Sequence, residues 1–144
     1  MENDADKKGL CPVSGTRGRK VDTATVKCLL DISLNEVGDM PYYFCRDRDC
    51  PVVYFAEDGS HTFEIQDVRE RVFQKEMENR SVFVCYCFRY TVGDIQEEGA
   101  TVDNSQIVAA INEGIRAGQC ACDWRNPQGD CCLGNVVALI KSRS

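Results

Sequence analysis

The sequence predicts an α+β protein made of two small lobes, a β-rich lobe over residues 1–75 and a helical lobe over residues 76–144. Short apolar runs separated by turn residues fill the first half, whereas helical periodicity begins after residue 91. The ten cysteines form two groups, and the stretch between them contains none. The polar run QKEMENRS lies in this stretch and sets the expected boundary near residue 75.

The first lobe contains the signals of a β-hairpin. The run VVYF at 52–55 and the run HTFEI at 61–65 flank a turn at Asp58 and Gly59, a pattern typical of two paired strands. The earlier stretch CPVSGTRGRKV is rich in Gly, Pro and Ser and predicts a turn. Two further strands are predicted, RVFQK at 71–75 and SVFV at 81–84.

Three helices are predicted in the second lobe. Thr91 and Asp94 form the pattern of a capping box, and Gly99 ends the short helix that follows. A second helix is expected between Ser105 and Gly118, and a third after Cys132. Their apolar faces contain Ile107, Val108, Ile111 and Ile115 in the second helix, and Leu133, Val136, Val137 and Ile140 in the third.

Composition excludes several classes of protein. The chain of 144 residues is 43% hydrophobic and 28% charged, which is typical of a globular fold. A net charge of −6 argues against nucleic-acid binding, which relies on Lys and Arg, and favours a basic or small partner. No apolar run approaches the ~20 residues that a bilayer requires, so no membrane insertion is expected. The polar start has no signal-peptide core, which predicts a cytoplasmic protein.

The cysteines are the strongest functional signal in the sequence. Cytosolic thiols stay reduced, so ten cysteines indicate metal ligation in preference to a disulfide framework. The chain has a single histidine, His61, so most of the metal ligands must be sulfur. Soft thiolate sites select zinc, copper(I) and iron–sulfur clusters.

One cysteine group follows the strand predicted at 81–84. Cys85 and Cys87 form a C-x-C pair at the strand end, where the chain turns and both sulfurs can point into one pocket. Two predicted helices then return the chain to the stretch CACDWRNPQGDCC at 120–132, so both ends can close on one metal centre. Cys131 and Cys132 open the third helix, whose positive end favours an anionic cluster.

The other group combines Cys11 with the loop CRDRDC. Cys45 and Cys50 bracket four residues at the base of the predicted hairpin, a spacing found in structural zinc sites. In such a knuckle, backbone amides can point at the sulfurs. We therefore expect zinc at this end of the chain.

Four motifs in this order, CPVSG, YYFCRDRDCPVVYF, VCYCF and NPQGDCC, resemble the N-terminal domain of the CopZ copper chaperone family. The C-x-C pair and the later cysteine pair are also similar to the iron–sulfur module of bacterioferritin-associated ferredoxins. The resemblance covers about residues 11–140. It implies a small zinc-knuckle β-hairpin lobe followed by a helical lobe that binds a [2Fe-2S] cluster.

The resemblance also implies the ligands. The cluster would bind Cys85, Cys87, Cys122 and Cys132, with Cys131 and Cys120 as alternates for the last position. Zinc would bind Cys11, Cys45 and Cys50. The family's second cysteine is replaced here by Ser14, so the fourth zinc ligand would be Cys28, which we prefer, or His61 or water.

The resemblance implies an iron–sulfur and zinc-binding electron-transfer protein that supports copper(II) reduction and copper trafficking. Its partner would be a redox or metal-trafficking protein, such as a copper chaperone or transporter. The alternative is a zinc- or copper-binding module for metal resistance that is not redox active. The sequence shows neither a nucleotide motif nor a Cys–His pair typical of nucleophilic catalysis, so we expect no enzymatic activity.

Overall fold

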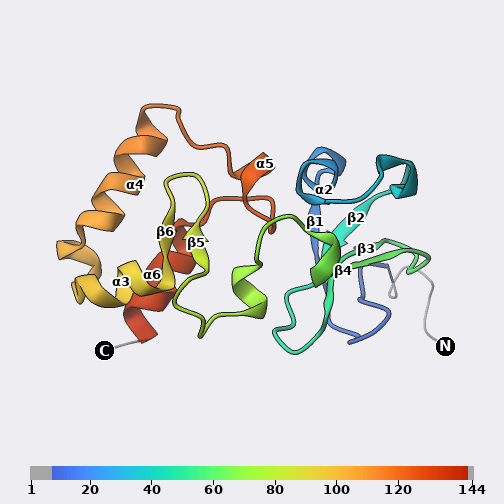
Figure 1. Cartoon of the computed structure of the whole chain (residues 1–144), viewed down its shortest axis with the longest axis horizontal. Helices are drawn as coiled ribbons and strands as arrows, with labels where there is room; N and C mark the ends of the chain where they lie inside the picture. Colours follow the sequence, from blue (N-terminus) through green and yellow to red (C-terminus); the bar gives the residue numbers. More distant parts are fainter. Residues whose placement is uncertain (1–7, 143–144) are drawn as a thin grey trace.

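The computed structural model describes residues 8–142 and combines an antiparallel sheet with several helices, as the sequence predicted (Figure 1). The first half contains β1 (Arg19–Val21), α2 (Thr23–Leu29), η1 (Leu34–Glu36), β2 (Tyr42–Phe44), β3 (Val52–Ala56), β4 (Thr62–Glu64) and η2 (Ile65–Asp67). The second half contains η3 (Phe73–Lys75), β5 (Phe83–Cys85), β6 (Tyr90–Thr91), α3 (Val92–Glu98), η4 (Val102–Asn104), α4 (Gln106–Arg116), α5 (Cys122–Arg125) and α6 (Leu133–Ser142).

The four strands of the first half form an antiparallel sheet in chain order, from β1 to β4. The predicted hairpin is present as β3 and β4, with Gly59 at φ +79° in the connecting turn. On its other side β3 pairs with β2, and Phe44 lies opposite Tyr54. All five residues of β3 are buried, so this strand forms the centre of the first half.

The strand predicted at 71–75 is wrong, because Phe73–Lys75 form a 3-10 turn. The Tyr86 hydroxyl accepts a hydrogen bond from the Phe73 amide and donates one to the Arg71 carbonyl. These bonds occupy backbone groups that a strand would use for pairing. Phe73 then packs into the core of the second half.

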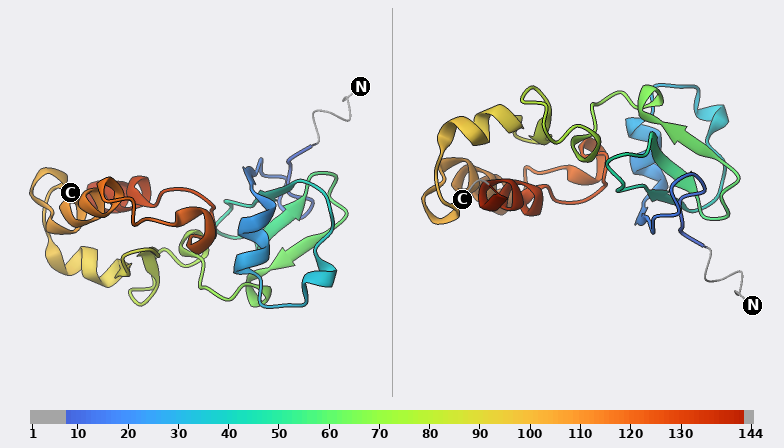
Figure 2. Two further views of the ribbon diagram at one scale, coloured as in Figure 1. Left: turned by 90° about the horizontal axis from the view of Figure 1, so that it is seen from above. Right: turned by 90° about the horizontal axis from the view of Figure 1, so that it is seen from below.

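The predicted helices of the second half are present. Thr91 and Asp94 form the capping box that starts α3, and Gly99 ends it at φ 61°. The Ser105 hydroxyl accepts a hydrogen bond from the Val108 amide and caps α4. In Figures 1 and 2, α3, α4 and α6 gather at the end of the molecule opposite the four-stranded sheet.

Besides a small cluster around Cys11, Cys45 and Cys50, two larger apolar clusters divide the chain between Val72 and Phe73. The first half encloses one cluster and the second half encloses the other. Their principal members are Val26, Leu29, Tyr42, Phe44, Val53 and Tyr54 in the first, and Val84, Cys85, Ile95, Ile111, Cys132 and Val136 in the second. The predicted lobe boundary near residue 75 lies close to this change and stays a prediction.

The loop that joins α5 to α6 connects the two halves. The buried Tyr54 hydroxyl donates a hydrogen bond to the Pro127 carbonyl, and Arg19 forms an ion pair with Asp130 at 2.6 Å. Asn126, 1% exposed, donates to the Asp130 carbonyl at 2.9 Å and holds the loop in shape. In Figure 1, α5 accordingly lies between the helical end of the molecule and α2.

Within residues 8–142, no helix has both the length and the apolar character that crossing a bilayer requires.

Gly129→Ala should destabilise the protein by more than Gly118→Ala. Both glycines have positive φ, +79° and +70°, which costs other residues roughly 1–2 kcal/mol. A Cβ at Gly129 would also lie 3.1 Å from the Val21 side chain, whereas one at Gly118 would meet nothing within 4 Å. Overpacking of this kind adds about 1 kcal/mol or more. Urea unfolding of both variants measures the difference, and equal losses would contradict the close contact between the halves.

Candidate metal centres

Cys11 begins a tight turn at the start of the described chain. The Gly15 amide donates to the Cys11 carbonyl at 2.8 Å, and the Cys11 amide donates to the Thr16 carbonyl at 2.9 Å. Gly15 has φ +75°, a conformation that glycine adopts without strain. The turn therefore folds residues 11–16 back on themselves and presents the Cys11 sulfur inward.

The loop between β2 and β3 supplies the next two cysteines. Cys45 directly follows β2, and Cys50 lies two residues before β3. Asp47 shapes the loop, since its carboxylate accepts the Asp49 amide at 3.0 Å and its carbonyl accepts the Cys50 amide at 3.2 Å. Pairing of the two strands thus brings both ends of CRDRDC together.

These three cysteines form a compact group of buried thiols. Their Sγ atoms all lie within 4.8 Å of one another, and those of Cys11 and Cys50 are 3.8 Å apart. A tetrahedral zinc centre with Zn–S bonds of about 2.3 Å separates neighbouring sulfurs by about 3.8 Å. The group therefore has the dimensions of a zinc site.

Ser14, which replaces the second cysteine of the resembled family, stands beside this group. Its Oγ lies 3.7 Å from Cys45 Sγ and is near enough to the Cys11 thiol to help lower the pKa of that thiol. The Thr16 amide donates to the same oxygen at 3.2 Å, which fixes its position. The serine hydroxyl thus occupies the corner of the site that three thiols leave open.

The structure does not bring Cys28 or His61 to this group. Cys28 is exposed on α2 and lines a hollow next to Trp124, because the buried face of that helix is formed by Val26 and Leu29. His61 is exposed at the start of β4 and lines a different hollow with Asn35. Ser14 is therefore the polar side chain closest to completing the site.

Local charges and hydrogen bonds act differently on these thiols. Burial opposes ionisation of Cys11, yet hydrogen bonds from the Ser14 hydroxyl and from nearby backbone amides lower its pKa overall. Burial raises the pKa of Cys45, and this is partly offset by backbone and Ser14 hydrogen bonds and by the Lys75 charge. The Lys75 ammonium donates to the Asp47 carbonyl at 2.6 Å, so it is anchored at the site.

Sequence reasoning missed the residues that support this site. The Thr16 hydroxyl donates to the Asp47 carboxylate at 3.3 Å and so ties the two cysteine-bearing loops together. The tendency of Asp to form local turns is a signal that could have found Asp47. No sequence signal pointed to Lys75, which reaches the site from the segment between the two halves.

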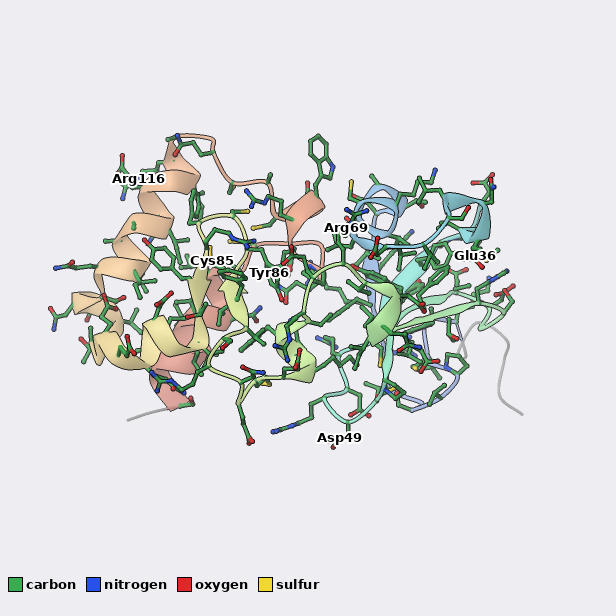
Figure 3. The ribbon with its side chains drawn as sticks, viewed as in Figure 1. Glu36, Asp49, Arg69, Cys85, Tyr86 and Arg116 are labelled. Atoms are coloured by element: carbon green, nitrogen blue, oxygen red, sulfur yellow. The ribbon has the colours of Figure 1, made fainter. Side chains whose placement is uncertain are left out.

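The second group of thiols comes from three segments of the second half. Cys85 ends β5, Cys87 lies in the turn that follows, Cys122 begins α5, and Cys132 immediately precedes α6. Figure 3 labels Cys85 and Tyr86 side by side near the middle of the molecule. The Tyr86 hydroxyl bonds to the 71–73 segment, so the residue between the two cysteines anchors the turn to a neighbouring segment.

The four sulfurs predicted to act together make contacts in a series. Cys87 Sγ lies 3.4 Å from Cys122 Sγ, and the Cys132 thiol lies near enough to those of Cys122 and Cys85 to shift their pKa values. Cys87 is half-buried, and the other three are buried. The Ala121 amide donates to Cys87 Sγ at 3.1 Å.

Two thiols of this series have a lowered pKa and two have a raised pKa. Contact with the Cys132 thiol lowers the pKa of Cys85 to about 7 and that of Cys122 to about 6. The pKa of Cys132 is raised by the same contacts, and burial raises the pKa of Cys87 to about 12. Four neighbouring thiols cannot all carry charge unless a cation joins them.

The alternates Cys120 and Cys131 lie outside this series of contacts. Both are exposed, and Cys131 Sγ accepts a hydrogen bond from the Leu133 amide at 3.5 Å. Cys132 is 1% exposed and belongs to the apolar core. The structure therefore favours Cys132 over its neighbour as the inward-facing thiol.

Comparisons with known proteins agree with the geometry of the first site. Residues 8–69 match the zf_CopZ family, described as a zinc binding domain. Residues 8–69 are therefore similar to a CopZ-type zinc-binding domain. The matched range contains Cys11, Cys45 and Cys50.

Similarity to CopZ also extends beyond this domain. The chain is 32% identical over 129 residues to the copper chaperone CopZ of Archaeoglobus fulgidus, covering 90% of this chain and 60% of that protein. The chain thus spans about 60% of the length of this relative. The crystal structure of the CopZ N-terminal domain from the same organism aligns with a TM-score of 0.70 at 29% identity, covering 90% of this chain and 95% of that one.

Cys45→Ala should abolish zinc binding and unfold the first half, whereas Cys28→Ala should change neither property. Zinc binding contributes directly to folding, with apparent free energies on the order of 10 kcal/mol in small zinc domains. Zinc content by mass spectrometry and melting by circular dichroism test both variants. Loss of zinc in Cys28→Ala would restore Cys28 as a ligand, and full zinc in Cys45→Ala would remove the three-thiol site.

Proposed function

We propose that this chain is an electron-transfer protein in which Cys85, Cys87, Cys122 and Cys132 hold a [2Fe-2S] cluster. Zinc at Cys11, Cys45 and Cys50 would stabilise the first half of the molecule. That half packs against the loop 122–132, whose ends carry two of the cluster ligands. The similarity to CopZ supports metal binding of the copper-chaperone type. The geometry of the four thiols supports the cluster.

The width of the four-thiol site is the observation that carries this proposal. Among the residues described, Cys11, Cys45 and Cys50 are the one group of three or more potential ligands whose atoms all lie within 4.8 Å of one another. Cys85, Cys132, Cys122 and Cys87 instead follow one another in a series of pairwise contacts. Such a spread is wider than a single tetrahedral ion requires and suits a centre with two metal ions.

The surrounding residues suit an anionic cluster. The Ala121 amide points at Cys87 Sγ, and hydrogen bonds to sulfur tune the reduction potential of iron–sulfur centres. Cys132 lies at the N-terminal end of α6, where the helix dipole favours negative charge. When bound, a [2Fe-2S] cluster would exchange one electron at a time. The buried sulfurs of Cys85, Cys122 and Cys132 would keep water from its inner side.

Copper enters this proposal because the chain is similar to the copper chaperone CopZ. One electron converts copper(II) to copper(I), the form that soft thiolate ligands prefer. A chain that supplies this electron would support copper trafficking, with a copper-carrying domain or a transporter as its partner.

A second function, without redox activity, follows from the same thiols. Four cysteines also form a complete ligand set for zinc or another soft ion. The 3.4 Å separation of Cys87 and Cys122 is compatible with a shared single ion. Metal content and visible absorption distinguish the two functions, because zinc and copper(I) thiolates are colourless.

Protein purified without oxygen should contain about two irons and two sulfides per chain and absorb visible light. Cys132→Ser should remove the iron and the absorbance while zinc remains, whereas Cys131→Ser, the adjacent exposed cysteine, should keep both. Iron, sulfide and zinc analysis with visible spectra measures the outcome. A colourless protein with zinc or copper on these thiols would replace the redox function by the second one.

Ser14→Cys should tighten zinc binding by adding a fourth thiolate, and Ser14→Ala should weaken it by about tenfold. The Ser14 hydroxyl contacts two of the three thiols, so a sulfur at this position would reach the same ion. Competition with a coloured zinc chelator measures both effects. Identical zinc release from the two variants and the parent protein would show that position 14 does not face the ion.

A further inference from the structure

A hollow of about 180 Å³ lies where α2 of the first half meets α5 of the second. Neither proposed metal site uses it. It is lined by Cys28, Leu29, Arg69, Glu70, Arg89, Trp124 and Arg125, and we call it the arginine hollow.

The arginine hollow is basic in an acidic protein. Three arginines line it against a single carboxylate, Glu70, which lies 3.9 Å from Arg89. Asp123 is exposed beside Trp124, and its backbone carbonyl is bound by the Thr25 hydroxyl. The lining therefore has an excess of positive charge on a chain whose net charge is −6.

Its arginines are held in place by contacts with the fold. Arg69 donates to the Leu30 carbonyl at 3.2 Å, and Arg89 lies 3.8 Å above the ring of Phe83. Arg125 donates to the Cys87 carbonyl at 3.5 Å. Fixed charges of this kind lose less side-chain entropy when a partner binds than mobile ones do.

The hollow borders the four-thiol site at its most accessible cysteine. Arg125 contacts the backbone of Cys87, Arg89 follows Cys87 by two residues, and Cys87 is the half-buried member of the four. Trp124 is 62% exposed at the rim. Trp and Arg are the residues most enriched among those that dominate binding energy at protein interfaces.

We propose that the arginine hollow is the docking surface for the electron-transfer partner, and that this partner presents an acidic surface. The proposal rests on the proposed function, since it requires the cluster. One electron passes between the reduced cluster and a one-electron acceptor on the partner, and no proton or bond is exchanged. The remaining acidic surface repels such a partner and so restricts productive contact to the hollow.

An acidic partner is the opposite of the basic partner that the net charge of the chain favoured. Small inorganic oxidants of opposite charge distinguish an acidic from a basic partner. The protein is reduced with dithionite, desalted without oxygen, and mixed in a stopped-flow instrument with hexacyanoferrate(III) or with tris(phenanthroline)cobalt(III). The return of visible absorbance gives the rate of electron transfer.

The decisive result is whether added salt raises or lowers the rate of oxidation. If the hollow controls access, oxidation by the anionic hexacyanoferrate(III) slows as salt is added, because screening weakens its attraction to the arginines. If net charge controls access, the same reaction accelerates with salt. The cationic cobalt complex should show the opposite dependence in each case.

Arginine variants inside and outside the hollow show which charges control the rate of oxidation. Arg69→Gln and Arg125→Gln should together slow oxidation by hexacyanoferrate(III) on the order of tenfold at low salt. Arg116→Gln removes one positive charge from the C-terminal end of α4, which Figure 3 shows far from Arg69; it is the matched control for Arg69→Gln alone and should leave the rate nearly unchanged. Arg69→Gln alone tests the charge without touching Cys87.

The outcomes separate this inference from the proposed function. Protein without iron, or without a visible spectrum, would overturn the proposed function and the electron-transfer role of the hollow with it. Protein with the intact spectrum whose reaction with hexacyanoferrate(III) accelerates with salt, or is unaffected by Arg69→Gln, would overturn the docking surface alone.

Discussion

The loop from Cys122 to Cys132 is the constraint on which both halves depend. Its ends carry Cys122 and Cys132, two of the four thiols proposed to hold the cluster, and its middle packs against the sheet of the first half through Tyr54 and Arg19. Any shift of the sheet would therefore move the loop that positions the thiols. Zinc bound at Cys11, Cys45 and Cys50 would stabilise the cysteine loops of the sheet and would thereby also hold the second site.

Electrostatics explains why both thiol groups suit cations. Gathering sulfurs in a buried space penalises charge on each of them, as the raised pKa of Cys45 and of Cys87 shows. Interaction with Cys132 offsets this penalty only for Cys85 and Cys122, whose pKa values are lowered. Metal binding removes the conflict, because the cation stabilises all the thiolates together.

Sequence patterns predicted the elements whose signals are local. The capping box at Thr91, the periodic apolar residues of α4 and the Asp58–Gly59 turn needed no tertiary information. The strand expected at 71–75 was wrong because Tyr86, thirteen residues later, binds that backbone. The short α2 was not predicted, since two helical turns show little periodicity, and its packing decides that Cys28 faces away from the zinc site. Ser14 was identified as a departure, but its contact with two thiols follows only from the folded turn.

The arginine hollow gives the zinc-bearing half a role beyond support. Cys28, Leu29 and Arg69 line it from the first half, whereas Arg89, Trp124 and Arg125 line it from the second. Neither half alone forms the basic surface. Under the proposed function, loss of zinc would disrupt the arginine hollow even where the four thiols still held a cluster, so the rate of electron transfer would depend on zinc content through this contact between the halves.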